Sequence, residues 1–124
     1  NFDLLISKLK EKLNTNGVIV SYDPLETSLP IKIIRALYRP FQDDKDWEWP
    51  FTKATLMKIK NNFDVIEIRG ILGKSKYGVL LNLVPLNNAF KTRIIAKMVA
   101  QDWNSTQIEH VYSCMHTTML LRKK

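Results

Sequence analysis

Cysteine, histidine and clustered carboxylates are the side chains of this sequence that could carry chemistry, and their spacing offers little of it. His110 and Cys114 are four residues apart, so on a helix they share a face and could give two metal ligands. A structural zinc site needs four ligands, and no second pair has ligand-like spacing. Cys114 also lacks an evident histidine, oriented by Asp or Asn, that would activate it as a nucleophile. We therefore expect no metal, no cofactor and no enzymatic activity.

A second group of residues is acidic and lies just ahead of Pro50: Asp43, Asp44, Asp46 and Glu48. Their spacing does not match an EF-hand loop, and the central Gly of that loop is missing. A solvated loop accounts for them. Trp47 and Trp49 lie among these acids, and two indoles beside four carboxylates could dock a basic, apolar protein or fold back over the edge of the core.

The segment "RGILGKSKYG", residues 69–78, contains the letters "GKS" that end a P-loop. That motif needs a Gly five residues before the Gly of "GKS", and Ile68 stands there. The segment also lies between two strand-like runs, whereas a P-loop joins a strand to a helix. It is typical of a β-hairpin turn, whose basic residues are Arg69, Lys74 and Lys76.

The elements that position these residues follow from the spacing of apolar side chains. Pro30 is suited to open a helix, and Thr52 is suited to cap one. The pattern predicts strands over residues 17–22, 63–68 and 77–84, and helices over residues 2–13, 31–38, 53–62, 90–103 and 108–119. The apolar sides of these elements predict a shared core of Leu5, Leu9, Ile34, Leu56, Ile59, Ile66 and Leu81.

Length and composition favour one globular domain. The chain has 124 residues, 45% of them hydrophobic and 25% charged, which is ordinary for a globular protein. No apolar run approaches the ~20 residues of a membrane span, so we expect no membrane partner. A single cysteine favours a reducing compartment, nuclear or cytoplasmic. The sequence begins at Asn1 without Met, which predicts a fragment of a larger protein.

The formal charge of +7 is unevenly distributed along the chain. Residues 1–51 carry 7 basic and 8 acidic groups, net −1, whereas residues 52–76 and residues 77–124 each carry 6 basic and 2 acidic groups, net +4. A charge excess confined to part of a chain indicates a face that meets an anionic partner. It is also consistent with a charge that only keeps the domain in solution.

The predicted order over residues 2–84 is helix, short strand, helix, helix, strand, turn, strand. This order resembles the winged-helix fold, a three-helix core closed by a small antiparallel sheet. The resemblance implies that residues 52–62 take the place of the recognition helix and residues 69–76 that of the wing. We expect an α+β domain spanning residues 1–124, in which residues 86–124 add two C-terminal helices.

The resemblance and the charge together predict a nucleic-acid-binding domain, with DNA as the first expectation and RNA as the other nucleic acid it could contact. Ammonium groups neutralise phosphates, and an Asn amide can pair with an adenine edge. The predicted contact residues are Lys53, Lys58, Lys60 and Asn61 on the third helix and Arg69, Lys74 and Lys76 on the wing.

The competing hypothesis is a module for protein docking or self-association within a replication, transcription or RNA-handling assembly. The chain has four Met and three Trp, and its predicted C-terminal helices carry wide apolar stripes. Those stripes are equally consistent with a buried core. The candidate residues for a protein partner, or for a second copy of the chain, are Trp47, Trp49, Met115 and Met119.

Overall fold

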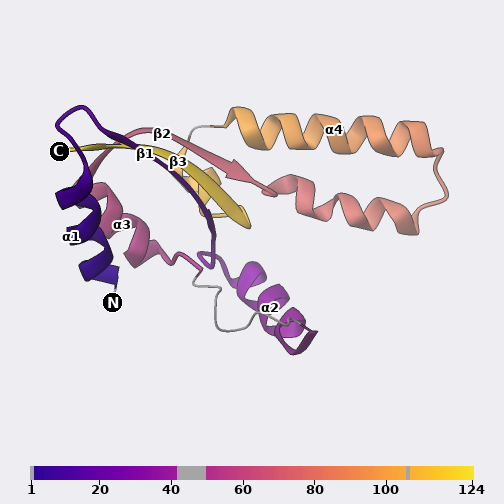
Figure 1. Ribbon diagram of the computed structural model, residues 1–124. Coiled ribbons are helices and arrows are strands. Elements are labelled where there is room, and N and C mark those ends of the chain that lie inside the picture. Colours follow the sequence, from indigo (N-terminus) through magenta and orange to yellow (C-terminus); the bar gives the residue numbers. More distant parts are fainter. Residues whose placement is uncertain (1, 42–49, 106) are drawn as a thin grey trace.

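The computed structural model of the protein describes residues 2–41, 50–105 and 107–124 (Figure 1). Its elements in chain order are α1 (Phe2–Lys12), β1 (Val18–Pro24), α2 (Leu29–Tyr38), the 3-10 helix η1 (Arg39–Phe41), α3 (Lys53–Asn62), β2 (Phe63–Ile71), the 3-10 helix η2 (Lys74–Leu83), α4 (Asn88–Asn104), α5 (Ile108–Val111) and β3 (His116–Lys123). The protein is α+β with a small antiparallel sheet, which confirms the fold class that the sequence predicts.

The sheet has the strand order β1–β3–β2, and both pairs are antiparallel. Its central strand, β3, is the last element of the sequence, so β1 and β2 each pair with β3 and not with one another. Val20 lies opposite Leu120 in one pair, and Ile68 lies opposite Met119 in the other. Residues 72–115 leave the sheet after β2 and return to its middle.

The predicted hairpin is wrong, because residues 77–84 do not form a strand beside β2. Most of them belong to η2, which packs along α4. Gly78 marks the close contact, since a Cβ built on it would lie 3.0 Å from Cγ1 of Ile95. The apolar residues 77–83 therefore pack on α4, and β2 pairs with residues 116–123 instead.

The predicted helix over residues 108–119 is also wrong beyond its first turn. α5 ends at Val111, and β3 begins at His116. Thr117, Met119 and Leu121 are buried, and the residues between them are less so, which is the two-residue period of a strand. The apolar spacing at residues 111, 115 and 119 fits a helix as well, but β-branched Thr and the central place between two strands favour the extended form.

The core lies between the sheet and the helices α1 and α3, and it contains Ile6, Leu25, Leu56, Ile59, Phe63, Val111, Cys114, Met119 and Leu121. The predicted core is therefore right for Leu56 and Ile59. Leu9, Ile34 and Leu81 are half-buried, whereas Leu5 and Ile66 are 50% and 49% exposed. α1 turns Ile6 inward in place of Leu5, and Ile66 sits where the register of β2 shifts between Val65 and Glu67.

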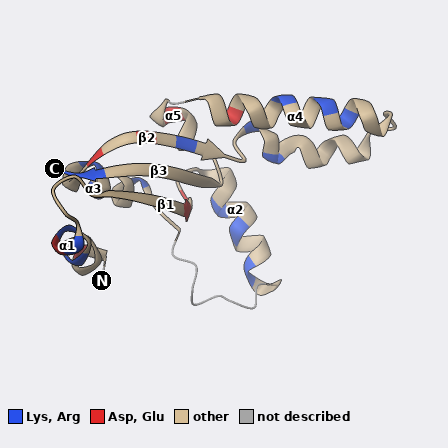
Figure 2. Ribbon diagram, turned by 45° about the horizontal axis from the view of Figure 1, so that its top comes forward, with Lys and Arg blue, Asp and Glu red and all other residues tan. Residues whose placement is uncertain are grey.

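α2 projects away from this core instead of completing a three-helix bundle (Figures 1 and 2). Pro30 opens the helix as expected, and Ile31 is its only fully buried side chain. Nε of Arg35 donates a hydrogen bond to the carbonyl of Leu25 at 3.1 Å, which fixes the base of α2.

η2 and α4 lie side by side and extend beyond the end of the sheet (Figure 1). Residues 74–104, which contain both helices and their connection, are called the arm below. The side chain of Asn87 caps α4 by accepting a hydrogen bond from the N–H of Ala89 at 2.8 Å. In the described ranges, no helix has the length and apolar character needed to cross a bilayer.

Candidate functional site

α3 presents three of the predicted nucleic-acid residues to solvent. The hydroxyl of Thr52 caps the helix by accepting a hydrogen bond from the N–H of Thr55 at 3.2 Å. Leu56 and Ile59 face the core, whereas Lys53, Lys60 and Asn61 on the same helix are exposed. The ammonium of Lys53 lies 5.1 Å from the ring centroid of Tyr112. Within the described ranges, Lys53 and Lys60 make no ion pair.

Lys58 faces α1 instead. Its ammonium donates hydrogen bonds to the carboxylate of Asp3 at 2.8 and 3.0 Å. The amide of Asn62 lies beside this pair, where it accepts from Lys10 at 3.0 Å and donates to the backbone carbonyl of Lys58 at 2.9 Å. This edge of α3 therefore joins two helices through exposed polar contacts, which typically contribute about 0.2 to 1 kcal/mol each.

Arg69 connects β2 to the last turn of α4. Its guanidinium forms an ion pair with Glu67 and donates to the backbone carbonyl of Trp103 at 2.8 Å. The same group lies 5.5 Å from the Trp103 ring. Arg69 thus links the arm to the sheet, and its guanidinium donates hydrogen bonds to acceptors of the same chain.

Lys74 and Lys76 lie in the first turn of η2 and not in a hairpin turn, so the predicted wing does not form. The ammonium of Lys76 donates to the carbonyls of Gly73 and Ser113, each at 2.7 Å, and lies 4.7 Å from the Tyr77 ring. Of these two lysines, only Lys74 is exposed. Lys76 therefore joins the arm to the turn after α5, a role that spacing alone did not indicate.

The base of the arm contains a buried carboxylate that the sequence analysis missed. Asp102 is 1% exposed and accepts hydrogen bonds from the N–H of Lys74 at 2.8 Å, the N–H of Ser75 at 2.9 Å and the hydroxyl of Ser75 at 2.6 Å. The amides of "GKS" thus hold an anion, as P-loop amides do, but the anion comes from the same chain. The available signal was that Asp102 is the one acid among residues 74–104.

Asp102 remains ionised because its hydrogen bonds outweigh its burial. Burial alone would raise the pKa of this carboxyl, but the bonds from Ser75 and Lys74 and the charge of His110 lower that pKa below its ordinary value of 3.8. Nε2 of His110 lies 3.4 Å from the carboxylate. The contacts of the Asp102 carboxylate therefore connect α4, η2 and α5.

Cys114 completes the base of the arm as a buried thiol. It donates to the carbonyl of His110 at 3.3 Å, and burial together with the nearby Asp102 raises the pKa of the thiol to about 11. A thiol with that pKa is protonated at neutral pH and is a poor nucleophile. Among the described residues, no three of His, Cys, Asp and Glu are placed to hold a metal ion. The acidic cluster of residues 43–48 lies outside them.

The candidate protein-binding residues also fall in different places. Met119 is 1% exposed and belongs to the core, which corrects its assignment to an interaction surface. It is buried because β3 is the central strand. Met115 is half-buried, and its carbonyl accepts a hydrogen bond from the N–H of Leu25 at 2.7 Å. Trp47 and Trp49 lie outside the described residues.

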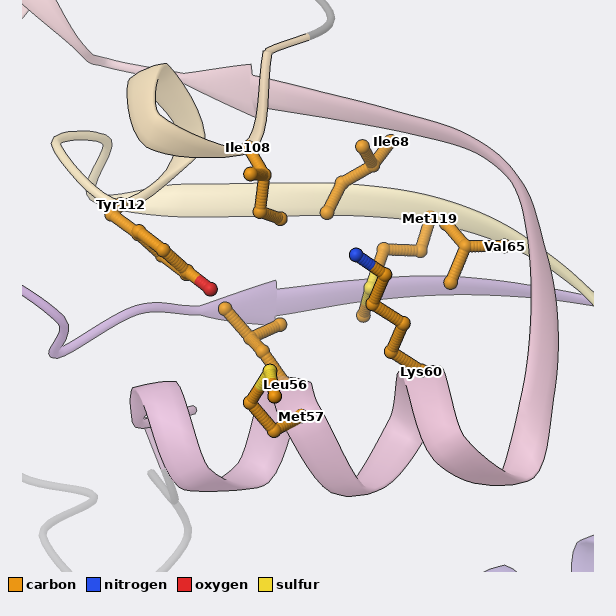
Figure 3. Close-up of a pocket in the computed structure, with 8 residues that line it drawn as sticks. All are labelled: Leu56, Met57, Lys60, Val65, Ile68, Ile108, Tyr112 and Met119. Carbon is orange, nitrogen blue, oxygen red and sulfur yellow. The ribbon is translucent and has the colours of Figure 1, made fainter.

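An apolar pocket of about 300 Å³ opens between α3, β2 and α5 (Figure 3). It is lined by Leu56, Met57, Lys60, Val65, Ile68, Ile108, Tyr112 and Met119. Lys60 and Tyr112 bring the polar ends of their side chains to this pocket from opposite sides (Figure 3).

The arm is a second candidate binding surface, because many of its large apolar side chains are exposed. Leu83 is 82% exposed and Val79 is 65% exposed. The nine large apolar side chains exposed on the arm are Tyr77, Val79, Leu80, Leu83, Val84, Leu86, Phe90, Val99 and Trp103. Its charged groups are five basic residues and Asp102, net +4, and the acid is buried at its base.

Basic side chains are distributed over several elements and do not gather on α3 and η2 alone. Figure 2 shows Lys and Arg on α1, α2 and α4 and near the C-terminus as well. The ammonium of Lys124 lies at the end of α3, where it donates to the carbonyls of Lys60 at 2.7 Å and Asn61 at 3.2 Å.

Comparison with known proteins finds no matching family model, no similar curated protein and no similar solved structure.

Proposed function

We propose that this domain is a protein-docking module whose arm binds an acidic, apolar segment of another protein. The observation that carries the proposal is the number of large apolar side chains that residues 77–103 expose, nine in all. Large apolar side chains that gather on one exposed part of a protein often mark an interaction site. The arm also projects from the sheet, so a partner can reach it without displacing the core (Figure 1).

The charge of the arm favours an acidic partner over a second copy of this chain. The side chains of Lys91, Arg93 and Lys97 lie on α4, and the arm has no exposed acid to pair with them. Two such arms would bring net +4 against net +4, which opposes association. A partner that presents apolar residues flanked by carboxylates satisfies both the apolar surface and the basic one.

Binding to a synthetic amphipathic helical peptide, with Leu on one face and Glu on the other, tests this proposal. We expect saturable binding by calorimetry, which the Leu80→Gln, Leu83→Gln double variant weakens by about tenfold or more, as loss of central apolar contacts does. Val20→Gln is the matched control, because Val20 is 70% exposed on β1 outside the arm.

A matched peptide with Lys in place of Glu should bind much more weakly. Equal binding of the two peptides, or equal loss with Val20→Gln, would overturn the proposal, as would no measurable binding of the Glu peptide. Tighter association with anionic vesicles than with the Glu peptide would instead assign the arm to a membrane surface.

Nucleic-acid binding is the second candidate, favoured by the exposed basic edge of α3. Lys53, Lys60 and Asn61 are exposed there, with Lys124 beside them, and Lys74 is exposed on η2. The elements α1, β1, α2, α3 and β2 follow one another in the predicted order, whereas residues 72–115 stand where the wing was expected. These features support phosphate contact by lysine.

A salt titration with duplex DNA distinguishes this candidate from the first. If Lys53 and Lys60 contact phosphates, the Lys53→Gln, Lys60→Gln variant should reduce the slope of log affinity against log salt by about 0.9 for each lost contact. Leu80→Gln with Leu83→Gln should leave duplex affinity unchanged. No measurable duplex affinity at low salt would exclude the second candidate and leave the first intact.

A further inference from the structure

We infer that the pocket between α3, β2 and α5 is a binding site for a small apolar carboxylate, such as a medium-chain fatty acid. This inference does not rest on the arm or on the proposed docking function. It combines a preformed apolar cavity with one cation and one hydroxyl at its edge.

The floor and walls of the pocket are held in place by the core. Leu56 and Met119, which are 5% and 1% exposed, also belong to the core cluster. Val65, Ile68 and Ile108 are half-buried. Among the described residues, Met57, Lys60 and Tyr112 complete the lining. A cavity built on core residues exists before a ligand arrives, which lowers the cost of binding.

The polar groups at the pocket define the chemistry of its ligand. The ammonium of Lys60 and the hydroxyl of Tyr112 point toward the cavity (Figure 3), and both can donate hydrogen bonds. Among the residues that the structure describes, no acidic side chain lines the cavity. Lys53 adds a second positive charge, 5.1 Å from the Tyr112 ring. A carboxylate is complementary to this arrangement, because a charged acceptor satisfies two donors in a partly apolar site.

The size of the pocket limits the apolar part of the ligand. At about 300 Å³ the cavity lies at the lower end of the range for small-molecule sites, which is roughly 300 to 1,000 Å³. A short alkyl chain or a single ring fits that space, and a long acyl chain does not. Met57 is 52% exposed and stands at the opening, where an unbranched thioether can adjust to chains of different shape.

The experiment follows amide NMR shifts of the full chain during titration with octanoate, octanol and octylamine, which share one tail and differ in the head group. We expect octanoate to bind saturably, with shifts centred on α3, β2 and α5. Lys60→Gln should weaken octanoate by about fivefold to tenfold, which corresponds to about 1 to 1.4 kcal/mol, and leave octanol nearly unchanged, because only the carboxylate loses a charge-assisted bond.

Tyr112→Phe should weaken octanoate to a smaller extent, and Lys97→Gln on α4 should have no effect. Lys60 and Lys97 are both exposed, so these variants keep the fold, and circular dichroism checks it. Octanol or octylamine binding as tightly as octanoate would overturn the proposal, as would shifts outside the pocket or no saturation. An acetylated dipeptide ending in Leu that binds more tightly would assign the site to a protein C-terminus instead.

Discussion

The carboxylate of Asp102 in the last turn of α4 accepts hydrogen bonds from both the N–H and the hydroxyl of Ser75 in the first turn of η2, at 2.9 and 2.6 Å. These two residues are 27 positions apart and are both buried. Their contact closes the base of the arm, because it joins the end of one arm helix to the beginning of the other.

Replacing this carboxylate should destabilise the protein. We expect Asp102→Asn to lower the free energy of unfolding by about 1 to 3 kcal/mol, because the amide cannot accept all the bonds that two carboxylate oxygens receive. Urea unfolding measures the change. Asp64→Asn is the control, since the Asp64 pair with Arg122 is exposed at 3.8 Å and should contribute less than about 0.5 kcal/mol. Equal effects of the two changes would contradict this role of Asp102.

The contribution of Asp102 should depend on pH in one direction. Its pKa in the folded protein is below the ordinary value of 3.8, so the folded state favours the ionised form. The stabilisation is then complete above pH 3.8 and is lost as the pH falls through the lower, folded-state pKa. The difference in unfolding free energy between the wild type and Asp102→Asn should therefore shrink on acidification. A difference that grows in acid would reverse the assignment.

Gly70 should not tolerate a side chain unless Cys114 is reduced in size. A Cβ at Gly70 would lie 2.3 Å from Sγ of Cys114 and 3.1 Å from its Cβ. Gly70→Ala should therefore cost about 1 to 3 kcal/mol by overpacking. Cys114→Ala removes the nearer atom, so the double variant should be more stable than the sum of the single effects predicts, as a double-mutant cycle would show. Additive effects would argue against this contact.

Met119 and Met57 should respond differently to truncation. Met119→Ala should cost about 2 to 5 kcal/mol, because Met119 is buried in the core on the central strand. Met57→Ala should change stability by less than about 0.5 kcal/mol, because Met57 is 52% exposed. Thermal unfolding of both variants checks this pair. A small effect at Met119 would restore the interpretation of Met119 as an interface residue.

The sequence predicts those parts of the fold whose signals are local. α1, β1, α2, α3 and β2 lie close to the predicted ranges, because Pro30 and Thr52 mark helix starts and alternating apolar residues mark strands. The helix predicted over residues 90–103 corresponds to α4 for the same reason.

The misassigned segments are those whose structure depends on distant contacts. Residues 77–83 are apolar enough for a strand and become helical because Asp102 holds the first turn of η2 and α4 covers it. Residues 116–123 fit a helical spacing and become a strand because β1 and β2 flank them. At the candidate site, the sequence does not show that Lys58, Arg69 and Lys76 form hydrogen bonds within the chain, because their partners lie far along the sequence.

The central position of β3 has a consequence for the order of folding. A chain that emerges from the ribosome in sequence order can form its helices early, because their contacts are local. β1 and β2 have no sheet partner until residues 116–123 have been synthesised, and their edges stay open to other chains in that interval. Closing such long loops costs entropy that rises only slowly with length, so the delay affects rate more than stability. The last strand therefore assembles the whole sheet in one late step.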